Sequence, residues 1–155
     1  MYGLFLVQAV PAHAETAGAT MAVSATVVET CSVAASPLSF RLANTPGLDA
    51  QAQSTIALNC NSATGFEIAL DPGGNAAGGV RRMVESESGA ALAYEIYSDA
   101  ARSIPWGDDA GVDTVAGAAG PGRGVVFTAY GSIVPSMAQL APGRYTDTVV
   151  VTVNF

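Results

Sequence analysis

The sequence contains little positive charge. Its 155 residues include six Lys+Arg, all of them arginine, against thirteen Asp+Glu, and the formal net charge is −7. Charged residues make up 12% of the chain, about half of the roughly 25% that is usual in soluble domains. Nucleic acids and anionic membranes attract clustered cations, so neither is an expected partner of this chain.

Lysine is absent, and the single histidine, His13, lies in a segment that we expect to be removed. The mature chain therefore has no residues for a histidine-based triad, a histidine metal site, a Schiff-base lysine or a Walker-type phosphate loop. No serine stands in a G-x-S-x-G pattern either. The sequence predicts that the protein is not an enzyme and holds no cofactor and no metal.

The first fourteen residues are typical of a secretory signal. An apolar run from Tyr2 to Val10 precedes Ala12 and Ala14, which fit the small-x-small cleavage pattern. We predict a signal peptide over residues 1–14, with an incomplete start because no Lys or Arg precedes the run. The alternative is an ordinary N-terminal strand. A membrane-spanning helix needs about 20 apolar residues, so the mature protein is expected to be exported without membrane insertion.

The two cysteines, Cys31 and Cys60, support export. They are an even pair in a chain without C-x-x-C spacing or other metal ligands. We predict that they form one disulfide, as secreted proteins often do. The alternative is a pair of buried, reduced thiols.

Apolar residues alternate with a period of two in most segments, which is typical of β-strands. Near the N-terminus, the apolar face consists of Met21, Val23, Ala25 and Val27. Turn clusters rich in Gly and Pro separate the segments, so we predict one all-β domain, an immunoglobulin-like sandwich. The predicted strands are Met21–Val28, Ser32–Phe40, Gln53–Asn59, Phe66–Leu70, Ala91–Tyr97, Gly124–Ile133 and Tyr145–Phe155.

The long segment from Gly107 to Gly124 has few large side chains and is predicted to be an irregular, solvated connection. It contains Asp108, Asp109 and Asp113, which could in principle ligate Ca²⁺. Their spacing lacks the ordered ligand series and the terminal Glu of a calcium loop. We therefore interpret them as solvated loop residues.

Two other groups of side chains have both a functional and a structural interpretation. Glu85 and Glu87 lie close to Arg81 and Arg82 and resemble an acid/base pair, but such neighbours more often form surface ion pairs. The single tryptophan, Trp106, is a candidate platform for stacking a sugar. A lone tryptophan beside a turn more often covers one edge of the core, and we favour that interpretation.

Three segments resemble a known family. They are Ala93-Tyr94-Glu95-Ile96-Tyr97-Ser98-Asp99-Ala100-Ala101-Arg102, then Tyr130-Gly131-Ser132-Ile133-Val134-Pro135, and the terminal Pro142-Gly143-Arg144-Tyr145-Thr146-Asp147-Thr148-Val149-Val150-Val151-Thr152-Val153-Asn154-Phe155. Together with the strands that lead to the two cysteines, they resemble the spore coat protein U domain family, which includes major pilins of archaic chaperone-usher pili. The resemblance extends from about Ala19 to Phe155.

The resemblance implies an incomplete immunoglobulin-like sandwich that lacks its last strand and is completed by a neighbour's N-terminal donor strand. Residues 15–29 would be the donor extension and residues 30–155 the pilin domain. The donor side chains would be Met21, Val23, Ala25 and Val27. The residues that line the acceptor groove or contact a chaperone would be Val149, Val151, Val153 and Phe155. Donor-strand complementation is a known form of strand addition.

The implied function is a structural subunit of an adhesive surface pilus. Its partners would be identical or related subunits, a periplasmic chaperone and an outer-membrane usher, and the chain would pass through the periplasm to the cell surface. One alternative is a self-complemented, secreted, coat-like structural protein. Another is a carbohydrate-binding tip adhesin that uses Trp106, Tyr94 and Tyr97, although the predicted mature chain has room for only one domain.

Overall fold

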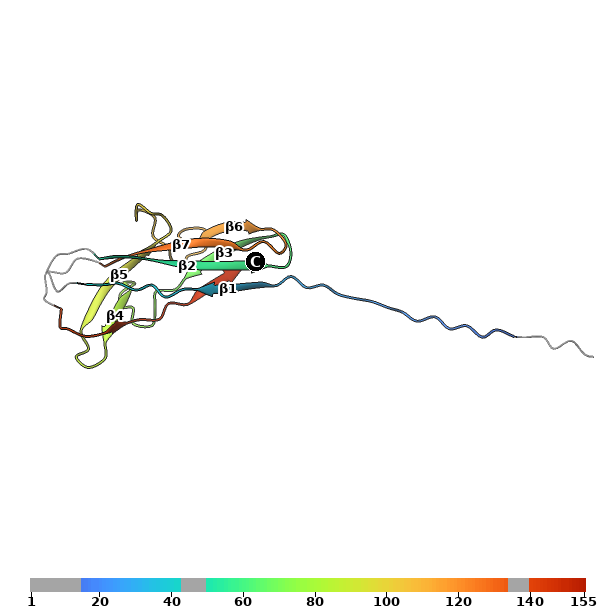
Figure 1. Ribbon diagram of the computed structural model, residues 1–155, viewed down its shortest axis with the longest axis horizontal. Coiled ribbons are helices and arrows are strands. Elements are labelled where there is room, and N and C mark those ends of the chain that lie inside the picture. Colours follow the sequence, from blue (N-terminus) through green and yellow to red (C-terminus); the bar gives the residue numbers. More distant parts are fainter. Residues whose placement is uncertain (1–14, 43–49, 134–139) are drawn as a thin grey trace, which may run out of the picture.

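The computed structural model describes residues 15–42, 50–133 and 140–155. Within these ranges all regular elements are β-strands (Figure 1). They are β1 (Cys31–Ala35), β2 (Gln51–Cys60), β3 (Thr64–Leu70), β4 (Arg82–Glu85), β5 (Ala91–Tyr97), β6 (Val115–Ala119), β7 (Val125–Ile133), β8 (Tyr145–Thr146) and β9 (Val151–Asn154). The predicted all-β class is confirmed. The predicted signal peptide, residues 1–14, lies outside the described residues.

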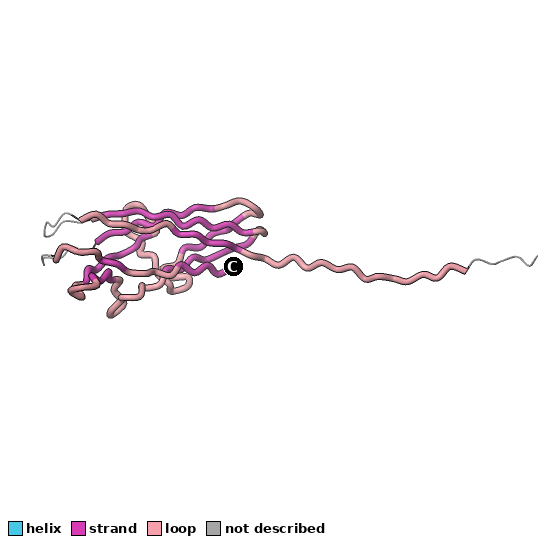
Figure 2. The backbone as a smooth tube through the Cα atoms, turned by 60° about the horizontal axis from the view of Figure 1, so that its bottom comes forward, coloured by secondary structure: helices cyan, strands magenta, loops and turns pink. Residues whose placement is uncertain are grey.

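The strands form two antiparallel sheets. One has six strands in the order β1-β2-β7-β5-β4-β8, and the other has three in the order β6-β3-β9. Side chains from both sheets meet in one hydrophobic core, so the domain is an immunoglobulin-like sandwich, as predicted. The strands run mostly along the long axis of the domain, and the N-terminal segment leaves it at one end (Figure 2).

The core forms because alternate residues of the central strands are apolar. Ile56 and Leu58 of β2 face Ile68 and Leu70 of β3, and all four are at least 98% buried. Full burial of such a side chain is worth about 1.5–3 kcal/mol. Trp106 also lies inside the core, where its indole N–H donates to the Ile68 carbonyl at 2.9 Å.

Four predicted strands, Gln53–Asn59, Phe66–Leu70, Ala91–Tyr97 and Gly124–Ile133, correspond to β2, β3, β5 and β7. The predicted strand Ser32–Phe40 is shorter in the structure, because only β1 pairs with β2. The prediction for Gly107–Gly124 was wrong, since this segment contains β6, which pairs with β3. The residues of β6 are mostly Ala and Gly, so the sequence shows no clear alternation of apolar and polar side chains there. One of them, Gly117, leaves room for the Phe66 ring directly opposite.

The predicted strand Tyr145–Phe155 divides between the two sheets. β8 pairs with β4 in the six-stranded sheet, whereas β9 pairs with β3 in the other sheet. Residues 147–150 between them make hydrogen bonds to the turn at residues 71–75 instead of joining a ladder. The chain therefore passes from the six-stranded sheet to the three-stranded sheet through residues 147–150.

Candidate functional site: an open groove and a free arm

The sandwich is open along β1. Within the described part of the chain, β1 pairs only with β2. Val33 of β1 lies directly opposite Leu58 of β2 and therefore shares its inward face. Yet Val33 is 41% exposed, whereas Leu58 is 1% exposed. The inward face of this edge strand is uncovered.

The edge strand of the other sheet, β9, also carries apolar side chains that are incompletely buried. It pairs only with β3 among the described residues, and its Val153 lies directly opposite the fully buried Ile68. Val151 and Val153 are only half-buried, and Phe155, two residues further along the same face, is 54% exposed. Each sheet therefore ends, among the described residues, in a strand that pairs on one side only and whose apolar side chains turn towards the core without being fully covered.

A groove with a volume of about 790 Å³ lies on this open side. Its two walls are residues 35–42, which continue from β1, and residues 143–149, which lead to Val151 of β9. The floor is the hydrophobic core itself. Apolar or aromatic floor residues are Ile56, Leu70, Met83, Leu92, Tyr94, Ile96 and Ala129. A long apolar trough between two walls suits an extended chain with alternate apolar side chains.

One wall is fixed by polar contacts with a distant turn. The Tyr94 hydroxyl donates to Asp147 Oδ2 at 2.7 Å, and the Asn75 backbone N–H donates to Asp147 Oδ1 at 3.0 Å. Burial raises the pKa of the Tyr94 hydroxyl, and the bond to Asp147 raises it further, so the hydroxyl remains a donor. On the other side of the turn, Asp71 Oδ1 accepts from the Val150 N–H at 2.8 Å. These bonds hold residues 147–150 extended although they belong to no strand.

A buried arginine supports the same turn. The Arg81 guanidinium donates to the carbonyls of Leu70 and Asp71 at 2.7–3.0 Å and forms an ion pair with Glu95 at 2.8 Å. Arg81 is 5% exposed. The prediction of a surface charge group was therefore wrong for Arg81, because the sequence does not reveal the carbonyls that its guanidinium satisfies.

Glu85, the other member of that predicted surface group, is also buried. Its carboxylate accepts from the hydroxyl and backbone N–H of Ser88, both at 2.7 Å, and from the Glu87 N–H at 3.2 Å. The Ser88 hydroxyl bond, followed by these backbone bonds, lowers the pKa of Glu85. Glu85 therefore closes the turn after β4 and is not paired with either arginine as an acid/base site.

The N-terminal segment, residues 15–30, forms an arm that extends away from the domain (Figure 1). The predicted strand Met21–Val28 has no partner strand in the structure. Met21, Val23 and Val27 are 87–90% exposed, and the other arm residues are exposed too. The arm therefore carries an alternating apolar face that nothing in its own domain covers.

The root of the arm is held firmly. Cys31 and Cys60 form a disulfide with an S–S distance of 2.06 Å, in the pairing that the sequence predicts. Beside it, the Asn61 side chain accepts from the Thr30 N–H at 2.9 Å and donates to the Val28 carbonyl at 2.8 Å. The backbone N–H of Asn61 donates to the Thr30 carbonyl at 3.0 Å. The amide group of Asn61 thus continues the β1–β2 ladder and directs the arm outwards.

The structure places the predicted acceptor residues along one wall, but not all of them in the groove. Val149 and Val151 line it, whereas Val153 and Phe155 continue the same face beyond it. The sequence analysis missed the opposite wall, although the alternation in Pro37-Leu38-Ser39-Phe40 indicated it. Leu38 and Phe40 are half-buried there, and Phe40 packs on Tyr94 with ring centroids 6.2 Å apart.

The side chains named for sugar binding do not form a surface platform. Trp106 is 1% exposed and Tyr94 is 4% exposed, and only Tyr97 is half-buried. Trp106 lies within the core, edge-on to Phe127, and does not cover a core edge as predicted. This burial excludes the carbohydrate-binding site that was considered.

The aspartates of the acidic loop bond within the loop or are exposed, and they form no candidate metal site. Asp113 Oδ1 accepts from the Asp109 N–H at 2.8 Å, so this carboxylate organises its own loop, while Asp108 is exposed. Among the described residues, no three His, Cys, Asp or Glu side chains are placed to hold a metal ion. None of the described residues belongs to a helix long and apolar enough to cross a membrane.

The family model for the spore coat protein U domain matches residues 17–152, which include most of the arm, the edge strand β1, the residues that line the groove and the first half of β9. The chain belongs to the spore coat protein U domain family. A curated member of similar sequence is Protein U of Myxococcus xanthus, which is 39% identical over 83 residues, or 54% of this chain and 45% of that protein.

The sandwich of this spore coat protein U domain also resembles a solved structure. That structure is the CsuC–CsuE chaperone–tip adhesion subunit pre-assembly complex from the archaic chaperone-usher Csu pili of Acinetobacter baumannii. The similarity covers 84% of this chain and 41% of the matched chain, with a TM-score of 0.64 and 24% identity. The chain spans less than half the length of both of these proteins.

Proposed function

We propose that this protein is a structural subunit of a surface pilus that polymerises by donor-strand complementation. The arm of one copy, residues 17–28, inserts into the groove of the next copy, between the segment that follows β1 and the segment that leads to β9. Met21, Val23, Ala25 and Val27 enter the groove, and the backbone of the arm pairs with the two free edges.

One observation carries this proposal above all: the same chain has an uncovered apolar arm and an uncovered apolar groove. An unpaired, apolar sheet edge is an aggregation liability that folded proteins normally cover. The arm and the groove lie on different parts of the molecule, so the contact between copies is heterologous. A heterologous contact whose rotation does not close builds a filament.

The self-complemented alternative is less well supported. The arm leaves the domain at the disulfide and extends away from it, and Asn61 holds residues 28–30 in that direction. A fold-back into the same molecule's groove would require a reversal beyond Val28. About four residues of the arm would then form a turn, and Val27 and Ala25 would be lost from the inserted face.

The free groove also supports the expected partners. Until a neighbour's arm arrives, the exposed edges need cover, and we propose that a periplasmic chaperone provides it before an outer-membrane usher takes the subunit to the cell surface. The similarity in fold to a chain of a chaperone–subunit pre-assembly complex supports the first of these steps.

The test compares two aspartates on neighbouring positions of the arm in the mature chain. In Val23→Asp the carboxylate enters the groove without a partner and costs several kcal/mol, so assembly should fail. In Ser24→Asp it points away from the groove, because successive side chains of a strand face opposite sides, and filaments should form. Electron microscopy and size-exclusion chromatography at several concentrations measure both. Equal loss of assembly in the two variants would overturn the donor-strand assignment.

A further inference from the structure

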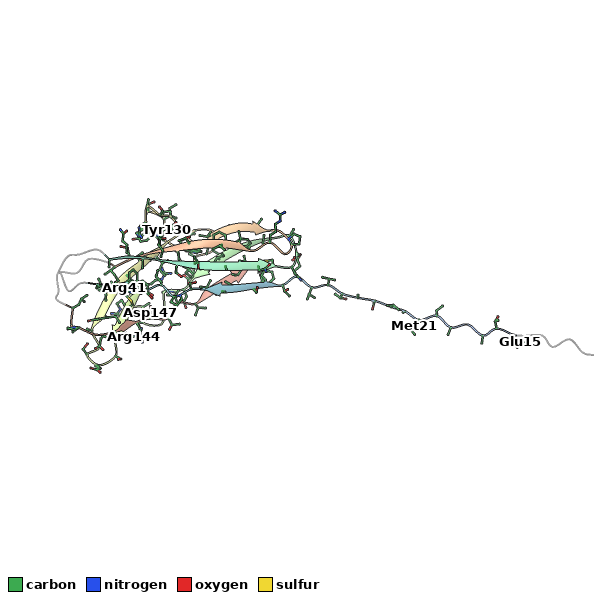
Figure 3. The ribbon with its side chains drawn as sticks, in the orientation of Figure 1. Glu15, Met21, Arg41, Tyr130, Arg144 and Asp147 are labelled. Atoms are coloured by element: carbon green, nitrogen blue, oxygen red, sulfur yellow. A yellow bond between two sulfur atoms is a disulfide. The ribbon has the colours of Figure 1, made fainter. Side chains whose placement is uncertain are left out.

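Two arginines that pair with no carboxylate of the described residues lie at one end of the domain, next to the groove. Arg41 and Arg144 are found at the end of the domain opposite the arm (Figure 3). Arg144 lines the groove, and Arg41 stands between the lining residues Phe40 and Leu42. Both arginines are exposed, and the ion pair formed within the described residues is the one between Arg81 and Glu95.

The carboxylates closest to this end have other partners. Asp147 accepts from Tyr94 and from Asn75. Glu85, which lies against Gly143, accepts from Ser88. Within residues 15–42, 50–133 and 140–155, no carboxylate pairs with either arginine.

The arm carries such carboxylates at its two ends. Glu15 and Glu29 flank residues 16–28, which contain no charged side chain. No described residue forms an ion pair with either glutamate. In an extended arm, Glu29 follows Val27 by two positions and therefore lies on the same face as the donor side chains.

The direction of insertion decides which glutamate meets the arginines. Each copy's own arm leaves beside the disulfide, at the end of the domain away from Arg41 and Arg144 (Figure 3). Copies that follow one another head to tail must therefore receive the incoming arm with its root at the arginine end. The incoming arm then runs antiparallel to β9, and Glu29, near its root, is the glutamate that comes to the end of the domain where Arg144 lies.

We propose that Arg144, assisted by Arg41, forms a cationic entrance to the groove that binds Glu29 of the incoming copy and sets the register of the inserted arm. This inference rests on the proposed function and names the contact that aligns it. If the arm slips by two residues along the groove, each donor side chain moves about 7 Å, to the place of the next donor side chain. Glu29 then no longer lies beside the arginines. A slip of one residue turns the apolar face away from the groove. Charges at the rim of an interface act mainly on the association rate and its salt dependence.

The experiment uses the mature chain with Val23→Asp as the acceptor, because its own arm is disabled while its groove is intact. The probe is a fluorescent peptide of residues 15–30 with a blocked C-terminus, followed by stopped-flow anisotropy. We expect Glu29→Gln in the peptide, or Arg144→Gln in the acceptor, to slow association about two- to five-fold, the usual range for an exposed ion pair. The association rate of the double variant should be little lower than that of either single variant, because both changes remove the same interaction.

Two matched controls isolate the position of the charge. Glu15→Gln in the peptide makes the same charge change at the other end, and Arg123→Gln in the acceptor removes an exposed arginine beside Gly122, whose N–H bonds to Cys60 at the disulfide end. Neither should slow association beyond the general effect of net charge. A swap of Glu29→Arg with Arg144→Glu should restore the rate that either change alone reduces.

The outcomes separate the two proposals. If the unaltered peptide does not bind, both the proposed function and this inference fail. If it binds but Glu29→Gln behaves like Glu15→Gln, or the charge swap restores nothing, the cationic entrance is wrong and the donor-strand function stands. Loss of the Glu29 effect in 0.5 M salt, with binding retained, is the expected result for a screened rim contact.

Discussion

Gly131 gives the sharpest test of the groove's geometry. A Cβ atom at this position of β7 would lie 2.6 Å from Phe40 Cζ and 2.8 Å from Leu38 Cδ2. Both of these side chains belong to the groove wall that continues from β1. Gly131→Ala must therefore shift the ends of the Leu38 and Phe40 side chains in this wall, because a contact below 3.0 Å cannot be kept.

Gly117 provides a control with the same clash in another place. A Cβ atom there would lie 2.6 Å from Phe66 Cζ, on the β3–β6 side of the sandwich. Phe66 does not line the groove. Overpacking of this kind typically costs about 1–3 kcal/mol, so Gly131→Ala and Gly117→Ala should lower the unfolding midpoint by similar amounts.

Only Gly131→Ala should weaken insertion of the arm. If about 1–2 kcal/mol of its strain falls on the wall that contacts the inserted strand, the affinity for the peptide of residues 15–30 should fall about 5- to 30-fold. With Gly117→Ala it should change less than about two-fold. Equilibrium anisotropy with the peptide and thermal unfolding of the same samples measure both quantities. Equal affinity losses, or unchanged affinity in a destabilised Gly131→Ala protein, would show that the arm does not contact the wall at Leu38 and Phe40.

The disulfide, two hydrogen-bonded carboxylates and the root of the arm each provide another test. Replacing Cys31 and Cys60 by serine opens a loop with a sequence separation of 29, and the chain-entropy estimate predicts a loss of about 3–4 kcal/mol in denaturant unfolding. Hydrogen bonds from Thr114 and Ser88 lower the pKa values of Glu67 and Glu85 below 4.5. Their contribution to stability is therefore complete above pH 4.5 and is lost as the pH falls through the lowered values, which acid titration of the unfolding midpoint measures. Asn61→Ala should speed hydrogen exchange of the amides at residues 29–31 while those of β2 remain protected, and unchanged exchange would contradict the clamp.

The sequence was most informative where side chains alternate. Apart from Ser54, the buried residues of β2 and β5 are apolar or aromatic at every second position, because both strands lie inside a sheet with one face on the core. The same alternation identified Met21, Val23, Ala25 and Val27, although their face is covered by nothing in this molecule. An alternating apolar pattern indicates a strand face that is suited to burial, whether the surface that buries it belongs to the same chain or to another.

Long-range polar contacts could not be predicted from the sequence. The chain from Tyr145 to Phe155 has the pattern of one strand, but Asp147 and Val150 bond to the turn at residues 71–75, more than 70 positions away. These bonds divide the strand and create one wall of the groove. Arg81 was misread for the same reason, because its partners are backbone carbonyls that only the fold brings together.

The exposed apolar residues at the edges of the groove suggest that insertion would bury as much apolar surface on the acceptor as on the arm. Val33 is 41% exposed and Phe155 is 54% exposed, whereas the inward residues of the strands next to them, Leu58 and Ile68, are 1% and 0% exposed. An inserted strand would complete the burial of both edges while it buries its own donor face, and it would satisfy two rows of free backbone groups. In the proposed joint, withdrawal of the arm would expose all of this apolar surface at once, so we expect a high barrier to dissociation and a joint that persists for kinetic reasons. Substitutions in the walls of the groove should therefore shorten the lifetime of the joint as strongly as substitutions of the donor side chains.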